Sequence, residues 1–71
     1  MNYTDFEAWR DNGFSPVQVA ILAQINGMNV SQTTNMLAEV FDMSFMEARR
    51  ACSTAQQFES LESYMAHIQG T

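Results

Sequence analysis

The fold is decided by residues 13–32, which read GFSPVQVAILAQINGMNVSQ. Between Pro16 and Asn26 this stretch is apolar on nearly every side of a helix, and a helix that is hydrophobic all round belongs at the centre of a fold. Gly13 and Gly27 flank it, at positions where the chain leaves one helix and enters the next. We therefore predict a central helix over 16–26, with other helices packed around it.

Helix-start signals divide the rest of the chain. A capping box pairs a small polar N-cap residue with Glu or Gln three positions later, so that each side chain satisfies a backbone amide. Such pairs occur at Thr4/Glu7, Ser15/Gln18, Asn29/Gln32 and Ser44/Glu47. In the last three pairs an apolar residue precedes the cap and is expected to pack on the first helical turn. These apolar residues are Phe14, Met28 and Met43.

The helix stops agree with the starts. Gly13, Gly27 and Gly70 are expected to take the left-handed conformation that ends a helix, and Asp42 is a weaker candidate for the same role. Strict alternation of apolar and polar residues never lasts, so no strand is predicted. The prediction is an all-α fold, a single helical domain over 1–71. Its four helices span 4–12, 16–26, 30–42 and 45–69, three of them short and the C-terminal one long.

Composition and charge exclude several classes of protein. The 71 residues carry a net charge of −5, with three arginines and no lysine. Binding to nucleic acid or to anionic lipid depends on clustered cations, so neither is expected. The apolar stretch Val17–Ile25 is too short to span a bilayer, and the N-terminus lacks the positive and apolar segments of a signal peptide. We expect a cytoplasmic protein that does not bind membranes.

No catalytic or metal-binding pattern is found. Cys52 is the only cysteine, which excludes an intramolecular disulfide and a zinc knuckle, and we expect it to be a buried small residue. Glu59, Ser63 and His67 follow one another at i, i+4 spacing, but a catalytic triad requires the histidine between nucleophile and acid. We therefore predict that the protein is not an enzyme and uses no cofactor and no metal.

The predicted helix over 45–69 is the main pointer to function. At 1.5 Å per residue it would extend about 37 Å, whereas a domain of this length has a radius of gyration of about 11 Å. Its first half carries small side chains suited to packing on the central helix, and its second half carries large apolar ones. The large ones are Phe58, Leu61, Met65 and Ile68. We predict that they form an exposed strip with Glu59 and Glu62 as a polar rim.

Exposed apolar strips mark contacts between proteins. The sequence therefore predicts a non-enzymatic protein–protein interaction module, a small acidic regulator or inhibitor. It would bind another protein and form a homodimer through its long C-terminal helix. In size and charge alone, the chain is similar to small acidic helical proteins of phages and bacteria, such as inhibitors, anti-CRISPR proteins and immunity proteins.

The alternative is a helix-turn-helix-like DNA-binding regulator that uses the second and third helices, with Gly27 in the turn between them. The third helix would present polar side chains to the bases, and Arg49 and Arg50 would contact phosphates. The polar side chains are Ser31, Gln32, Thr33, Thr34 and Asn35. The eight acidic residues of the chain oppose this alternative, because they repel the DNA backbone.

Overall fold

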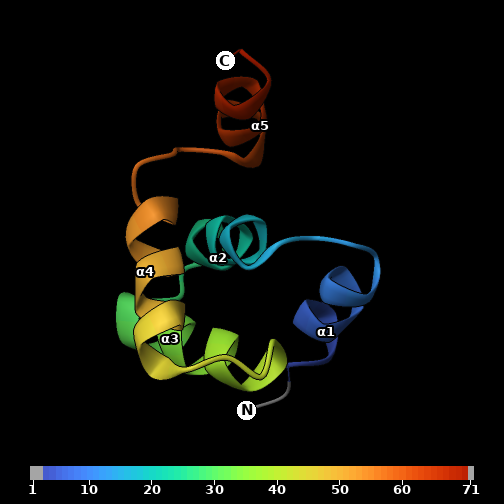
Figure 1. Cartoon of the computed structure of the whole chain (residues 1–71), viewed down its shortest axis with the longest axis vertical. Coiled ribbons are helices and arrows are strands. Elements are labelled where there is room, and N and C mark those ends of the chain that lie inside the picture. The colour runs from blue at the N-terminus through green and yellow to red at the C-terminus, as the bar shows by residue number, and fades with distance from the viewer. Residues whose placement is uncertain (1–2, 71) are drawn as a thin grey trace.

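A computed structural model describes residues 3–70 and contains five helices within that range (Figure 1). They are α1 (Thr4–Asp11), α2 (Pro16–Ile25), α3 (Val30–Val40), α4 (Phe45–Ala55) and α5 (Leu61–Gln69). The radius of gyration is 11.2 Å, and the molecule measures 34 × 22 × 22 Å along its principal axes. The all-α prediction is confirmed, and the first three helices end one or two residues before their predicted ends. The prediction of one long helix over 45–69 is wrong.

The α2 helix lies at the centre, as its apolar sequence predicts. It contacts each of the other four helices, and its side chains Val19, Ala20, Ile21 and Ala23 are buried. From α1, the aromatic rings of Phe6 and Trp9 pack edge to face against each other, with their centroids 5.3 Å apart, and both are half-buried on the core. The α2 helix therefore organises the whole domain.

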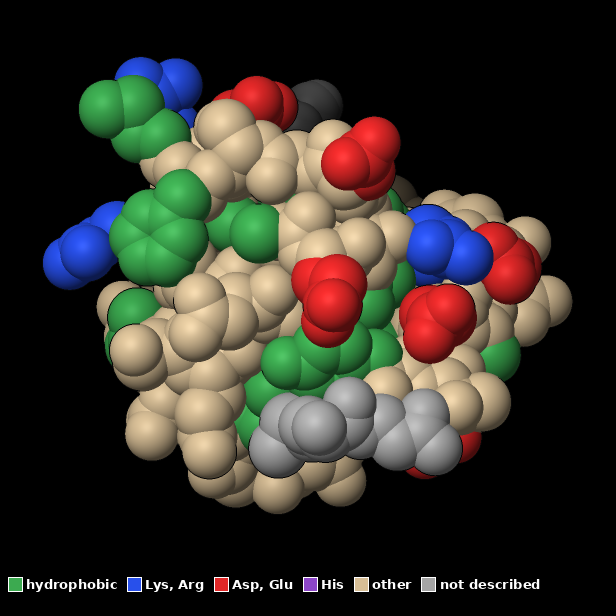
Figure 2. All heavy atoms as spheres, turned by 90° about the horizontal axis from the view of Figure 1, so that it is seen from below, with side chains coloured by type: hydrophobic (Ala, Val, Ile, Leu, Met, Phe, Trp, Pro, Cys, Tyr) green, Lys and Arg blue, Asp and Glu red, His purple; other side chains and the backbone are tan. Residues whose placement is uncertain are grey.

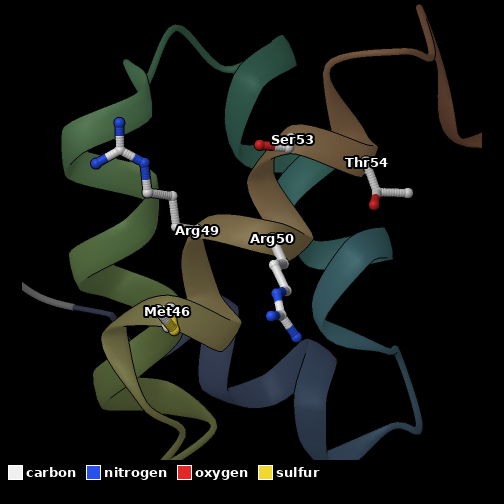
Figure 3. Close-up of a pocket in the computed structure, with 5 residues that line it drawn as sticks. All are labelled: Met46, Arg49, Arg50, Ser53 and Thr54. Atoms are coloured by element: carbon white, nitrogen blue, oxygen red, sulfur yellow. The ribbon is translucent and has the colours of Figure 1, made fainter.

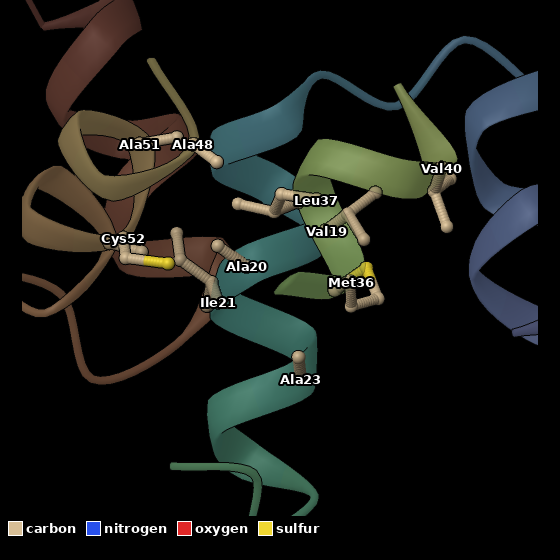
Figure 4. Close-up of a cluster of buried hydrophobic side chains, with 11 residues drawn as sticks. Val19, Ala20, Ile21, Ala23, Met36, Leu37, Val40, Ala48, Ala51 and Cys52 are labelled. Carbon is tan, nitrogen blue, oxygen red and sulfur yellow. The ribbon is translucent and has the colours of Figure 1, made fainter. Parts of the chain in front are cut away.

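The core is formed by α2, α3 and α4 (Figure 4). The α3 helix contributes Met36, Leu37 and Val40, and α4 contributes only small side chains. The small side chains are Ala48, Ala51, Cys52 and Ala55. Because they are short, α4 lies close to the two helices that it covers, which agrees with the sequence prediction for this segment.

The first three turns between helices share one design. In each, a residue with positive φ is followed by a half-buried apolar residue and then by the N-cap of the next helix. The first residue is Gly13 (φ 93°), Gly27 (φ 92°) or Asp42 (φ 51°). The amide after Gly13 donates to Trp9 O at 3.1 Å, and the amide after Gly27 donates to Ala23 O at 3.1 Å. These are the bonds of a Schellman C-cap, so these helix stops are confirmed.

Two of the four predicted capping boxes form completely, and a third forms in part. Ser15 with Gln18 and Asn29 with Gln32 form complete capping boxes. Ser44 accepts the amide of Glu47 through its hydroxyl oxygen, at 3.1 Å. The prediction that Thr4 caps the first helix is wrong, because Thr4 is already helical and Tyr3 occupies the cap position.

The prediction at the other end of the domain also fails. Gly70 has a φ of −79°, so the last helix does not end in a left-handed residue.

The helix predicted over 45–69 ends at Ala55, and α5 begins at Leu61. A straight helix of that length would extend about 37 Å, more than the 34 Å of the whole molecule. Instead the chain turns at 56–60, and the Ser60 hydroxyl caps α5 by accepting the Ser63 amide at 3.1 Å. The turn brings α5 against α2. A projecting helix would leave its large apolar side chains in water, and burying such a side chain completely is worth about 1.5–3 kcal/mol.

The turns provide a test of local backbone strain. Gly27→Ala is expected to lower the free energy of unfolding by about 1–2 kcal/mol, which is the cost of a left-handed non-glycine residue. No atom lies within 4 Å of the position that a Cβ would take, so the backbone conformation is the whole cost. At the third turn, Asp42→Gly introduces a glycine at a positive φ and is expected to raise the free energy of unfolding by about 0.5–1 kcal/mol. Thermal unfolding measures both, and a neutral Gly27→Ala would contradict the assignment.

Candidate functional site

The four apolar residues predicted as an exposed strip do not form one. Phe58 lies in the turn between α4 and α5, and it packs with Leu61 against the buried core. Met65 is also half-buried, whereas Ile68, at 47%, is exposed. The fold therefore uses much of the predicted strip to attach α5 to the domain.

Specific contacts fix this attachment. The Phe58 ring packs edge to face on Tyr64, with a centroid separation of 5.0 Å, and lies 5.4 Å from the ring of His67. The side-chain amide of Gln18 donates to Met65 Sδ at 3.0 Å, which joins α2 to α5 across 47 positions of sequence. These contacts hold the turn and α5 in place on α2.

The acidic residues predicted as a rim are both exposed. Glu59 lies in the turn before α5, and Glu62 lies in the first turn of α5, where a negative charge is favourable. Because Glu59 is not helical, the row of Glu59, Ser63 and His67 expected from their spacing is broken. No hydrogen bond or ion pair connects these three side chains within 3–70.

A different surface stands out in the structure. We call it the α4 outer face: the exposed side chains of Phe45, Met46, Arg49, Arg50 and Ser53. Phe45 is 56% exposed and Met46 is 70% exposed, the highest value among the large hydrophobic residues exposed in the described chain. Their spacing of one, three, one and three places them on one side of a helix, away from the buried alanines.

This surface is shallow rather than enclosed. Met46, Arg49, Arg50, Ser53 and Thr54 line an open depression on α4. Figure 3 shows that the side chains of Arg49 and Arg50 diverge as they leave the helix, and both line the depression. An extended or helical segment fits such a surface better than a small molecule, because small-molecule sites are concave and bury most of their ligand.

Charge distinguishes the α4 outer face from its surroundings. It holds two of the three arginines, while the chain outside α4 has one arginine and seven acidic residues. Arg10 donates to Val40 O at 2.6 Å and pairs with Asp11, but Arg49 and Arg50 have no hydrogen bond or ion pair with the described residues. At one edge of the molecule in Figure 2, hydrophobic side chains protrude beside basic ones, while most acidic side chains lie elsewhere in this view, with a further basic side chain beside them.

Sequence reasoning missed this surface because it followed the large residues after Ala55. The signal was present: the outer residues and the small inner residues of 45–55 form two complementary helical stripes. Arg49 and Arg50 were interpreted only as phosphate contacts of the DNA-binding alternative. The exposed pair Phe45–Met46 was not assigned a role.

The other candidate residues occupy structural positions. Cys52 is buried as predicted, 3.4 Å from the Thr34 hydroxyl, and burial raises the pKa of its thiol, partly offset by that hydroxyl. A raised pKa disfavours the reactive thiolate. Thr33 and Thr34 are also buried, and their hydroxyls donate to the carbonyls of Asn29 and Val30. These two threonines therefore cannot read DNA bases, as the helix-turn-helix alternative requires.

Comparisons with known proteins do not assign a role to the α4 outer face. No protein-family model, curated protein or solved structure shows a significant match to this chain. Among the described residues, no group of three His, Cys, Asp or Glu side chains is placed to hold a metal ion. No helix in 3–70 has the length and apolar character needed to cross a membrane.

The role of the C-terminal residues can be tested with a matched pair of substitutions. Leu61→Ser is expected to lower the free energy of unfolding by about 1–3 kcal/mol, because Leu61 packs on the core. Ile68→Ser on the same helix is expected to change it by no more than about 0.5 kcal/mol, because Ile68 is exposed. Thermal unfolding and light scattering measure stability and mass. A Leu61→Ser chain that keeps its stability but loses a dimer would show that Leu61 belongs to an interface.

Proposed function

We propose that this protein is a non-enzymatic protein–protein interaction module, a small acidic regulator or inhibitor that binds another protein through the α4 outer face. The observation that carries the proposal is the exposure of Phe45 and Met46 beside two arginines that have no hydrogen bond or ion pair with the described residues. Aromatic residues, methionine and arginine are the residue types enriched at protein interfaces. Four of the five residues on this face belong to those types.

The physical chemistry of the face favours binding. An exposed Met or Phe side chain gains about 1.5–3 kcal/mol when a partner buries it completely. Methionine adapts its shape to a partner at little cost, because its chain is unbranched and polarizable. Arginine combines a charge with a planar group that stacks on apolar surfaces. A small patch of this composition supports a transient contact rather than a permanent one.

The α4 helix is a firm support for these side chains. On its inner side Ala48, Cys52 and Ala55 are fully buried. At its start the Ser44 hydroxyl caps the helix through the Glu47 amide. A partner therefore meets side chains on a backbone that is already ordered, which reduces the entropy lost on binding.

The non-enzymatic part of the proposal rests on the positions of the reactive groups. Cys52 is buried, and Ser63 and His67 lie on the exposed side of α5 with Glu59 outside that helix. Self-association through Phe58, Leu61, Met65 and Ile68 remains a prediction. Its weak point is that only Ile68 of the four is exposed.

The DNA-binding alternative has less support. Of the five polar residues expected to read bases, Thr33 and Thr34 are buried. The side chain of Gln32 accepts the Asn29 amide at 3.1 Å in the capping box. Ser31 and Asn35 remain, on a helix without a cation.

A photo-crosslinking amino acid at position 46, compared with position 25, tests the proposal. Ile25 is a matched control, because it is 57% exposed but belongs to α2 and not to the α4 outer face. We expect position 46 to capture a protein in the cells that produce this chain and position 25 not to capture it.

The captured protein is then identified, purified and titrated by calorimetry. Met46→Ser is expected to weaken binding about tenfold, the loss of roughly 1.4 kcal/mol of apolar burial, whereas Ile25→Ser leaves it unchanged. Both substitutions are at exposed positions, so stability stays within about 0.5 kcal/mol. Equal capture at the two positions, or a partner indifferent to Met46→Ser, would contradict the proposal.

A further inference from the structure

We infer that the α4 outer face binds an acidic, amphipathic segment of a partner protein, in which an apolar side chain is flanked by carboxylates. The inference rests on the proposed function and specifies the chemistry of the partner. Its basis is the combination, on one helix face, of two exposed apolar side chains and two arginines that form no ion pair within residues 3–70.

Charge complementarity indicates that the bound segment is negatively charged. A neutral or basic segment lying on Arg49 and Arg50 would remove water from the guanidinium groups without pairing them, which is costly. Carboxylates pair with guanidinium groups through two parallel hydrogen bonds, which are about twice as strong as neutral ones. The nearest acid in the sequence, Glu47, makes no ion pair with either arginine among the described residues, and one of its carboxylate oxygens accepts the Ser44 hydroxyl at 3.0 Å.

The overall negative charge of the chain does not prevent this contact. Seven of the eight acidic residues lie outside α4. At physiological salt the Debye length is about 8 Å, so exposed charges beyond that distance act weakly on a bound segment. Arg49 and Arg50 would touch the segment directly, and their attraction is screened least.

The arrangement of the side chains suggests the order of residues in the partner. Arg49 and Arg50 diverge as they leave α4, and together with Met46, Ser53 and Thr54 they line the depression (Figure 3). A segment with an acidic, an apolar and an acidic side chain in turn would place its carboxylates at the two edges. Its apolar side chain would then lie on Met46.

A nucleic acid is the less favoured occupant of this face. A phosphate backbone would pair with the arginines but would gain nothing from Phe45 and Met46, which are more than half exposed. A single pair of cations also falls short of the larger Lys and Arg clusters on which nucleic-acid affinity depends.

The test is selection of short random peptides displayed on phage against the full chain. We expect the enriched peptides to combine Asp or Glu with a large apolar residue. Their binding is then measured by fluorescence anisotropy against three variants. Arg49→Gln/Arg50→Gln is expected to weaken binding about tenfold or more, from the loss of two charge-assisted pairs. Met46→Ser is expected to weaken it also.

The third variant, Ser31→Glu/Ser63→Glu, is the control for net charge. It lowers the net charge by the same two units, at exposed sites in the first turns of α3 and α5, where acids are tolerated. We expect it to bind the peptides as the unmodified chain does. Equal weakening by this control and by the arginine variant would overturn the inference, because net charge alone would explain the effect.

Other outcomes separate the inference from the proposed function. Apolar peptides that depend on Met46 but not on the arginines would overturn the acidic partner and leave the interaction module standing. Peptides indifferent to every α4 substitution would overturn both. Arginine-dependent binding of a DNA duplex or an RNA strand, with affinity falling steeply as salt rises, would replace the acidic segment with a nucleic acid.

Discussion

The structure depends on burying a helix that has no polar side. Because α2 is apolar nearly all round, it is stable only when other helices exclude water from every face. The α3 and α4 helices supply the fully buried part of that cover, and α1 and α5 supply half-buried aromatic and aliphatic groups. In a chain of this size the core is small, so each covering helix contributes appreciably to stability. The return of α5 onto α2 follows from the same requirement.

The same requirement explains the surface that we assign to function. The α4 helix approaches α2 and α3 through alanines and Cys52, because only short side chains fit there. Its large side chains Phe45 and Met46 are therefore on the outside, together with Arg49 and Arg50. One face of α4 stabilises the fold, and the other is available to a partner. Because the buried side already holds the helix in place, little conformational entropy is lost when a partner binds the other side.

The two ends of the domain are held less firmly than the middle. No residue of α1 or α5 is fully buried within the described chain, whereas α2, α3 and α4 each contribute several buried residues. Single polar contacts assist: Arg10 donates to the end of α3, and Gln18 donates to Met65. Elements attached in this way are the first to open in a folded protein. The α4 outer face lies on the firmly held part.

The sequence by itself determined the local features: the central apolar helix, the caps at Ser15, Asn29 and Ser44, and the left-handed stops at Gly13 and Gly27. These features depend on hydrogen bonds and backbone conformations within a few residues, so a short stretch of sequence is enough to predict them. Only the tertiary structure decided that the chain turns at 56–60, where no glycine or proline marks a break. It also decided which large side chains are covered: Phe58 and Leu61 are partly buried, whereas Phe45 and Met46 are exposed. Those outcomes depend on packing between residues distant in sequence, such as Gln18 and Met65, because a side chain's exposure is set by the elements that fold over it.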